Sequence, residues 1–149
     1  MDQPLPYDIH DQESLTEWCR QVPERIATIE SFVPADLWSN LDFSPQSLKL
    51  VGDWIAQNFG SIDEIKETLG VERITALGAY AGEVHVRSLG WHWFAETEDS
   101  RFMDFRRPIV TDGKGKYRSP VSTITAFAHS HRPAVLYGAL AHLLEETQQ

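Results

Sequence analysis

Cysteine is almost missing from this chain of 149 residues. The one thiol, Cys19, excludes an internal disulfide and any zinc site built from several cysteines. Long apolar runs are missing as well, because no segment approaches the roughly 20 residues of a membrane span. The N-terminal stretch MDQPLPYDIHDQE lacks the basic and apolar regions of a secretory signal. These absences predict a cytoplasmic protein with no membrane partner.

The short motifs of common catalytic sites are also missing. The sequence contains no phosphate-binding loop, no HExxH, no G-x-S-x-G and no dinucleotide-binding fingerprint. His129 and His131 could lie on one side of a strand as metal ligands, but no carboxylate is near them in the sequence. We therefore expect no catalytic residue, no metal site and no cofactor.

Basic residues are scarce in the first part of the chain. Residues 1–67 hold thirteen Asp and Glu against four Lys and Arg, so the whole net charge of −9 lies there. Nucleic acid is an unfavourable ligand for this half, because phosphate binding needs positive surface. A basic partner protein would be attracted to it, although acidic surfaces also serve solubility alone. Residues 101–118 are the exception, with six basic side chains against Asp104 and Asp112.

The segment around which the chain is organised is residues 72–89. Its apolar residues recur at helical spacing and form one stripe, which predicts a buried central helix. Gly78 and Gly82 lie one turn apart on another side of this helix, and each costs about 1 kcal/mol of helix propensity relative to Ala. This cost predicts that another backbone or a bulky aromatic ring crosses closely over the two glycines. The stripe consists of Ile74, Leu77, Ala81 and Val84, with Tyr80 beside it.

Two charged residues stand alone in the stretch from residue 74 to residue 93. Glu83 and Arg87 are four residues apart in the favourable order, acid before base. They could form a pair at a partly solvated edge, worth a few tenths of a kcal/mol. Alternatively they could be largely buried and line a pocket with aromatic walls, suited to an anionic or zwitterionic small molecule. The candidate ligand-binding or partner-binding residues are then Tyr80, Glu83, Arg87, Trp91 and Trp93.

The first part of the chain is expected to be an extended arm over residues 1–10, followed by a helix. Asp11 and Ser14 both offer N-cap oxygens, and Ser14 has the capping-box spacing to Glu17. Pro23 interrupts the apolar period, so the helix either ends at the preceding residue or a second helix begins there. An ordered, turn-rich connection is expected over residues 36–43.

Clearer signals surround the next helices. A Ser-Pro pair at residues 44–45 starts a helix that Gly60 ends, and Ser61 starts a short helix that Gly70 ends. After the central helix, alternation predicts antiparallel strands near residues 91–96 and 102–111. Pro108 confines the second to a sheet edge or to the end of a strand. Further segments are predicted as a flexible basic turn at 112–116, a short helix or strand over 121–130, and a terminal helix from residue 134. The predicted fold is thus a single, mostly helical α+β domain, 1–149, with a small antiparallel sheet packed on helix 72–89.

The string GAYAGEV at residues 78–84, with Arg87, Gly90 and Trp93 after it, resembles a group of small bacterial domains of unknown function. The resemblance spans residues 44–145 in outline. It implies a solitary cytoplasmic protein, in some cases an immunity or inhibitor-type protein of a bacterial toxin system, and it implies no catalytic residues. The resulting hypothesis is a non-catalytic module that binds a basic protein. The alternative is a small ligand-binding domain or enzyme with a pocket around Glu83 and Arg87.

Overall fold

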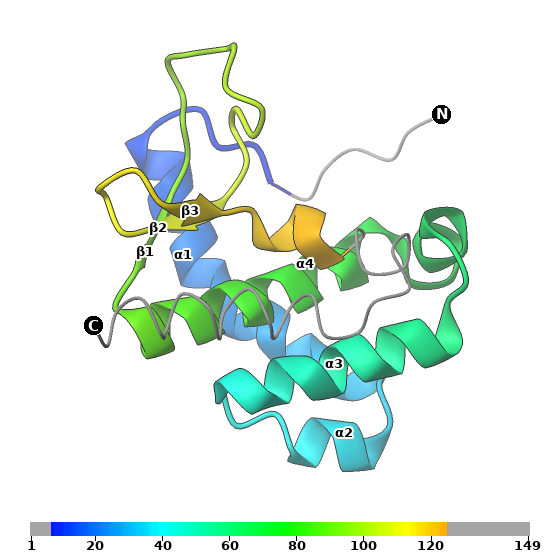
Figure 1. Ribbon diagram of the computed structural model, residues 1–149. Coiled ribbons are helices and arrows are strands. Elements are labelled where there is room, and N and C mark those ends of the chain that lie inside the picture. Colours follow the sequence, from blue (N-terminus) through cyan, green and yellow to red (C-terminus); the bar gives the residue numbers. More distant parts are fainter. Residues whose placement is uncertain (1–6, 125–149) are drawn as a thin grey trace.

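The computed structural model describes residues 7–124 of the chain (Figure 1). They form a mostly helical α+β domain with one small sheet, as the sequence predicts. The strands are antiparallel neighbours in the order β1-β2-β3, with Trp93 opposite Val110 and Thr111 opposite Tyr117. In chain order the elements are α1 (Gln12–Ala27), the 3₁₀ helix η1 (Thr28–Ser31), α2 (Ala35–Ser39), α3 (Pro45–Asn58), α4 (Ile62–Leu89), β1 (His92–Phe94), β2 (Ile109–Thr111) and β3 (Tyr117–Arg118).

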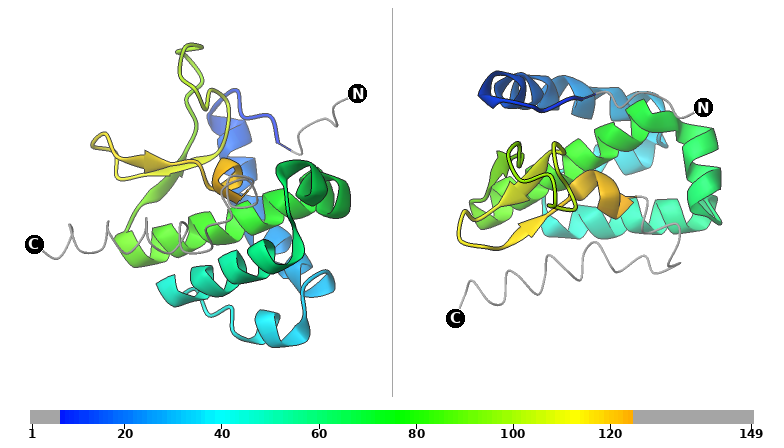
Figure 2. Two further views of the ribbon diagram at one scale, coloured as in Figure 1. Left: turned by 45° about the vertical axis from the view of Figure 1, so that its right-hand side comes forward. Right: turned by 90° about the horizontal axis from the view of Figure 1, so that it is seen from above.

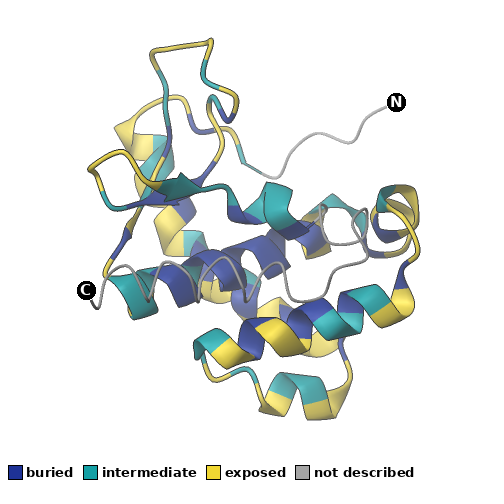
Figure 3. Cartoon of the chain, viewed as in Figure 1, coloured by how far each residue is buried: buried dark blue, intermediate teal, exposed yellow. Residues whose placement is uncertain are grey.

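Helix α4 is the centre of the molecule. Its residues are buried without a break from Ile74 to Gly82, and Figure 3 shows the buried stretch along its middle. Figure 2 shows α1 and α3 on opposite sides of α4. Both glycine signals are confirmed, because Gly70 has a non-helical conformation (φ 79°, ψ 167°) that splits α4 and Gly90 ends it at φ 73°. A residue with a side chain rarely adopts either conformation.

The predicted close approach over the two central glycines is confirmed. A β-carbon on Gly78 would lie 2.8 Å from the Cα atom of Val121, so a second backbone crosses there. A β-carbon on Gly82 would overlap the ring of Trp93, with the Cζ2 atom at 2.5 Å. Real β-carbons essentially never come this close to a neighbour. The helix therefore uses glycine where neighbours leave no room for a methyl group.

Helix α1 corrects one prediction and refines another. Pro23 lies inside the helix and does not end it. A proline within a helix costs about 3 kcal/mol, but this one is on the exposed side, while three large side chains on the other side are buried. Their burial offsets the lost hydrogen bond. The capping box at the start is formed by Asp11 and Ser14, and not by Ser14 and Glu17.

The strands are shorter than predicted because the chain turns repeatedly between them. Backbone hydrogen bonds from Phe102 to Asp99, from Phe105 to Phe102 and from Arg107 to Asp104 mark successive turns within the segment expected as a strand. The Arg106 N–H donates to the Glu96 carbonyl at 2.8 Å and closes the base of this loop. Strand pairing is thus limited to three residues on each side.

Strand β3 follows the segment that was predicted to be a flexible turn. The Asp112 carboxylate accepts the backbone N–H groups of Lys114 and Lys116, at 2.7 and 3.1 Å. These bonds fix a tight turn that brings Tyr117 and Arg118 beside β2. The segment predicted as helix or strand over 121–130 is helical over residues 120–124. Its remainder and the predicted terminal helix lie outside the described residues.

Candidate functional site

Tyr80, the first of the predicted site residues, is a packing residue. Its side chain is buried, and its hydroxyl accepts the Phe43 N–H at 3.0 Å and hydrogen-bonds the Ser47 hydroxyl at 2.7 Å. Burial raises the pKa of the Tyr80 hydroxyl, which is therefore neutral at physiological pH. Tyr80 thus connects the loop before α3, and α3 itself, to the central helix.

Glu83 and Arg87 form a loose pair at an edge of α4. The Arg87 Nε atom lies 3.8 Å from the Glu83 Oε1 atom, and the two side chains are 54% and 21% exposed. The second Glu83 oxygen accepts the indole N–H of Trp93 at 3.2 Å. The Arg87 guanidinium lies 3.6 Å from the centre of the Phe43 ring. This geometry fits a half-solvated pair held by aromatic neighbours better than a buried one.

The two tryptophans occupy different places. Trp93 lies over Gly82 and contacts Trp18 edge to face, with ring centres 5.4 Å apart. Trp91 is buried in a separate apolar cluster with Val110. The structure therefore brings Trp93 to Glu83, whereas Trp91 packs in the other cluster. The two clefts described below are lined by other residues.

His85 is a buried histidine on α4 that faces Trp91. Its Nδ1–H donates to the Ala81 carbonyl at 2.8 Å, and its ring centre lies 6.0 Å from that of Trp91. Burial lowers the pKa of His85, and the nearby positive charge of Arg118 lowers it further. The neutral imidazole is therefore the stable form in the folded chain.

We expect His85 to make the protein less stable in acid. The unfolded chain binds a proton at about pH 6.5, whereas the folded chain binds it only at a lower pH. The contribution of His85 to stability is therefore fully present above about pH 6.5. It is lost as the pH falls toward the pKa of the folded chain, by at most about 1.4 kcal/mol per pH unit. Urea unfolding across this range should show a smaller loss for His85→Gln than for the parent. If the variant and the parent lose the same stability in acid, His85 is not the group responsible.

An acidic cleft lies where the chain enters α1, and it is the larger of the two clefts. It has a volume of about 780 Å³ and is lined only by residues between Tyr7 and Gln21. No Lys or Arg is among its lining residues. Its carboxylates come from Asp8, Asp11, Glu13 and Glu17.

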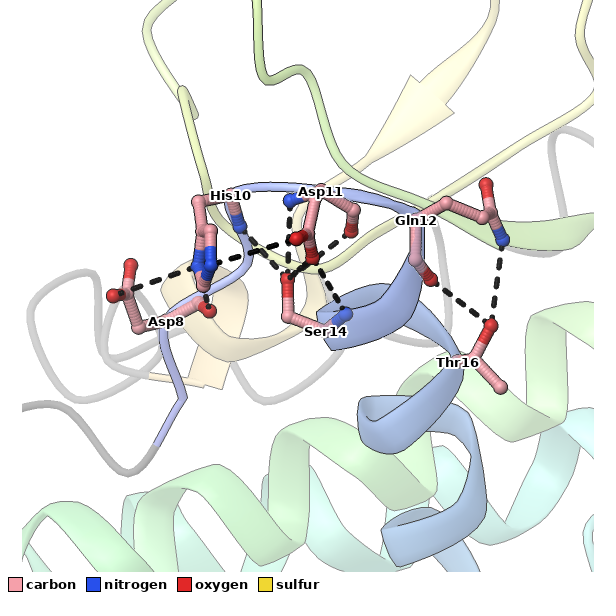
Figure 4. A network of polar contacts seen from close by, with 6 residues as sticks. All are labelled: Asp8, His10, Asp11, Gln12, Ser14 and Thr16. Atoms are coloured by element: carbon pink, nitrogen blue, oxygen red, sulfur yellow. Dashed lines mark hydrogen bonds and ion pairs between the residues drawn. The ribbon is translucent and has the colours of Figure 1, made fainter.

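The carboxylates of this acidic cleft differ in what they already bind. The Asp11 carboxylate accepts the Ser14 N–H at 2.8 Å (Figure 4), and this bond is the main cause of the lowered pKa of Asp11. Arg20 and Gln21 hydrogen-bond Glu17 and lower its pKa to about 2. The His10 Nδ1 atom lies 3.7 Å from the Asp8 Oδ2 atom, and its Nε2 atom lies 3.6 Å from the Asp11 Oδ2 atom.

The Glu13 carboxylate has no ion-pair partner in the part of the chain that the structure describes. Its side chain is exposed in the first turn of α1, and no ion pair there includes it. Asp8 is also exposed, with 77% of its side chain accessible, and its nearest ionic neighbour is only a histidine. Asp8 and Glu13 are therefore the carboxylates most available to a cation from outside.

The acidic cleft was not predicted from the sequence, which indicated an extended arm over residues 1–10. Ile9 is buried, and the ring of Tyr7 stands edge to face on Trp18 with centres 5.6 Å apart. The available signal was a pair of large apolar residues, Tyr7 and Ile9, placed among polar ones just before the helix. Their packing fixes the arm against α1 and opens the cleft beside it.

No metal site or membrane span is found within residues 7–124. This part of the chain contains no group of three or more His, Cys, Asp or Glu side chains that could hold a metal ion. None of its helices has the length and apolar character needed to cross a membrane. His129 and His131 lie outside the described residues.

Comparison of the chain with protein-family models, with curated proteins and with solved structures finds no match. The resemblance carried by residues 78–84 therefore stays a prediction.

Proposed function

We propose that this protein is a non-catalytic binding module that recognises a basic partner protein through the acidic cleft at the start of α1. The observation that carries the proposal is the lining of that cleft, which has four carboxylates and no Lys or Arg. A lysine- or arginine-rich surface would supply the cations that this lining lacks. Asp8 and Glu13 would meet those cations first, because they are exposed and form no ion pair with a Lys or Arg of residues 7–124.

The distribution of charge supports the same partner. All of the net charge of −9 falls within residues 1–67, which include the acidic cleft. Such a field speeds encounter with a basic protein, and its effect falls with ionic strength because the Debye length is only about 8 Å at physiological salt. The resemblance of residues 78–84 to proteins of immunity or inhibitor type agrees with a binding role. A nuclease-type toxin is one basic protein that would fit.

Affinity capture from the native host tests this proposal. The full chain should retain a stoichiometric basic protein at low salt and release it at high salt. The identified partner should then bind Asp8→Asn/Glu13→Gln at least tenfold more weakly, a loss of about 1.4 kcal/mol.

The control removes two negative charges that lie outside the acidic cleft. Glu30 and Glu67 are exposed and lie outside the acidic cleft, so Glu30→Gln/Glu67→Gln should bind nearly as the parent does. Equal weakening by both variants would show that only the total charge matters. Failure to retain a basic protein at low salt would contradict the proposal itself.

A further inference from the structure

A loop of opposite charge stands between β1 and β2. We call residues 101–107, with the sequence RFMDFRR, the basic loop. Arg106 and Arg107 are exposed, and no acidic side chain within residues 7–124 forms an ion pair with either. The acid of this loop, Asp104, is buried and does not cover them. Their positive charge therefore faces solvent.

The basic loop also exposes an apolar side chain. Met103 is 87% exposed, although the free energy of a methionine side chain favours burial. Methionine and arginine are both enriched in protein–protein interfaces, where lysine and the acidic residues are depleted. An exposed methionine beside two exposed arginines has the composition of a protein contact.

The basic loop and the acidic cleft lie at the same end of the molecule. Both Figure 1 and Figure 2 show the loop that leads from β1 to β2 near the chain segment that enters α1. A second cleft, of about 340 Å³, is lined by Asp11, Gln12 and Leu15 at the start of α1 and by residues 94–98, which precede the basic loop in the chain. Tyr7 is close enough to Arg107 for that charge to act on its hydroxyl. One face of the protein therefore carries an acidic and a basic area side by side.

We propose that this face binds a second copy of the chain, forming a two-fold dimer in which each basic loop contacts the acidic cleft of the other copy. A two-fold axis brings the same patch of both copies together, so a patch with adjacent areas of opposite charge is complementary to itself. The two Met103 side chains would supply apolar contact beside the charges. The dimer and the basic partner proposed above would compete for the same acidic cleft, and neither proposal requires the other.

A second copy fits the basic loop better than a nucleic acid does. A polyanion would be repelled by the net charge of −9, and the acidic cleft lies beside the loop. Two copies also repel each other at long range. At physiological salt this repulsion is screened beyond about 8 Å, whereas charges in direct contact at the interface are screened much less.

Sedimentation of the full chain over a concentration series tests the dimer. At physiological salt we expect reversible dimers, whose dissociation constant should rise when salt is raised to about 1 M. Arg106→Glu/Arg107→Glu should raise it at least tenfold. The control Lys49→Glu/Lys66→Glu makes the same charge change at exposed positions on α3 and α4 and should leave more of the association intact.

A reciprocal pair of variants identifies the contact. Alone, Asp8→Lys/Glu13→Lys should dimerise at least tenfold more weakly than the parent, as Arg106→Glu/Arg107→Glu should. An equal mixture of the two should form a heterodimer. The first variant carries positive charge at both the cleft and the loop, and the second carries negative charge at both, so each loop meets a cleft of opposite sign. A parent chain that stays monomeric at every concentration overturns the proposal. So does a parent that dimerises while the mixture does not, since the interface would then lie elsewhere.

Discussion

Replacing Gly82 by Leu is expected to lower the free energy of unfolding by more than the 1 to 3 kcal/mol usual for overpacking. Even the first added carbon would overlap the Trp93 ring, and Trp93 is held in place by Trp18 and by its hydrogen bond to Glu83. Helix propensity alone predicts a gain of stability of up to about 1 kcal/mol, because Gly is the poorer helix former. Packing and propensity therefore predict opposite signs, and urea unfolding measures which effect is larger.

Gly82→Ala separates the two effects more sharply. In the parent it should destabilise, since a single methyl group already meets the ring. In a Trp93→Ala background the ring is gone, and the same change should stabilise the helix by about 1 kcal/mol. A reversal of sign between the two backgrounds shows direct contact. If Gly82→Ala raises stability in both backgrounds, the ring does not press on Gly82.

Trp18→Ala is the second substitution with a large expected effect, a loss of about 3 to 5 kcal/mol. Trp18 is 2% exposed, and its ring contacts Tyr7 on one side and Trp93 on another. The substitution leaves a cavity at the point where the arm, α1 and β1 meet. It should also release Tyr7 and Ile9 and so open the acidic cleft. Urea unfolding gives the loss of stability, and faster amide hydrogen exchange at residues 7–10 would report the release.

The adjacent residue supplies the control. Cys19 is exposed on the same helix, so Cys19→Ala should change stability by no more than about 0.5 kcal/mol. A loss below about 1 kcal/mol for Trp18→Ala would mean that the aromatic contacts contribute little and that the arm is held by other residues. The indole N–H of Trp18 has no acceptor among the described residues. Trp18→Ala therefore removes no hydrogen bond of the indole within residues 7–124, and the expected loss of stability comes from packing.

Much of the helical part could be predicted because its signals are local. Ser44 caps α3 and Ser61 caps α4 through side-chain oxygens, and Gly90 ends α4 in the left-handed conformation that glycine favours. Gly78 and Gly82 were informative for another reason. Glycine is costly within a helix, so two of them one turn apart indicate a packing constraint.

The errors arose where tertiary contacts outweigh local rules. Pro23 removes a backbone hydrogen bond from α1, but burial of the apolar face keeps the helix intact. The segment 102–107 has aromatic residues that favour a strand, yet its backbone groups bond within turns and to Glu96. Strand β3 depends on the Asp112 side chain, which fixes a turn that glycine and lysine content alone predicts to be flexible.

Tertiary contacts also decide the surroundings of Glu83 and of the acidic cleft. Glu83 stood out because it is charged within an apolar helix, and the structure explains its presence by the N–H of Trp93, ten residues further on. The acidic cleft gave no comparable signal, since it depends on Tyr7 folding back onto Trp18. Hydrophobic periodicity describes the faces of regular elements. It carries no information about an irregular segment that packs through two side chains.

The contact between Trp18 and Trp93 also has a consequence for the order in which the chain is made. A ribosome adds roughly 5 to 20 residues per second, so about 75 residues of further synthesis separate the two rings by roughly 4 to 15 seconds. Until α4 and β1 have been made, the apolar face of α1 lacks partners that cover it in the folded chain. Slower synthesis of the segment between α1 and α4 would lengthen the time for which this face is uncovered.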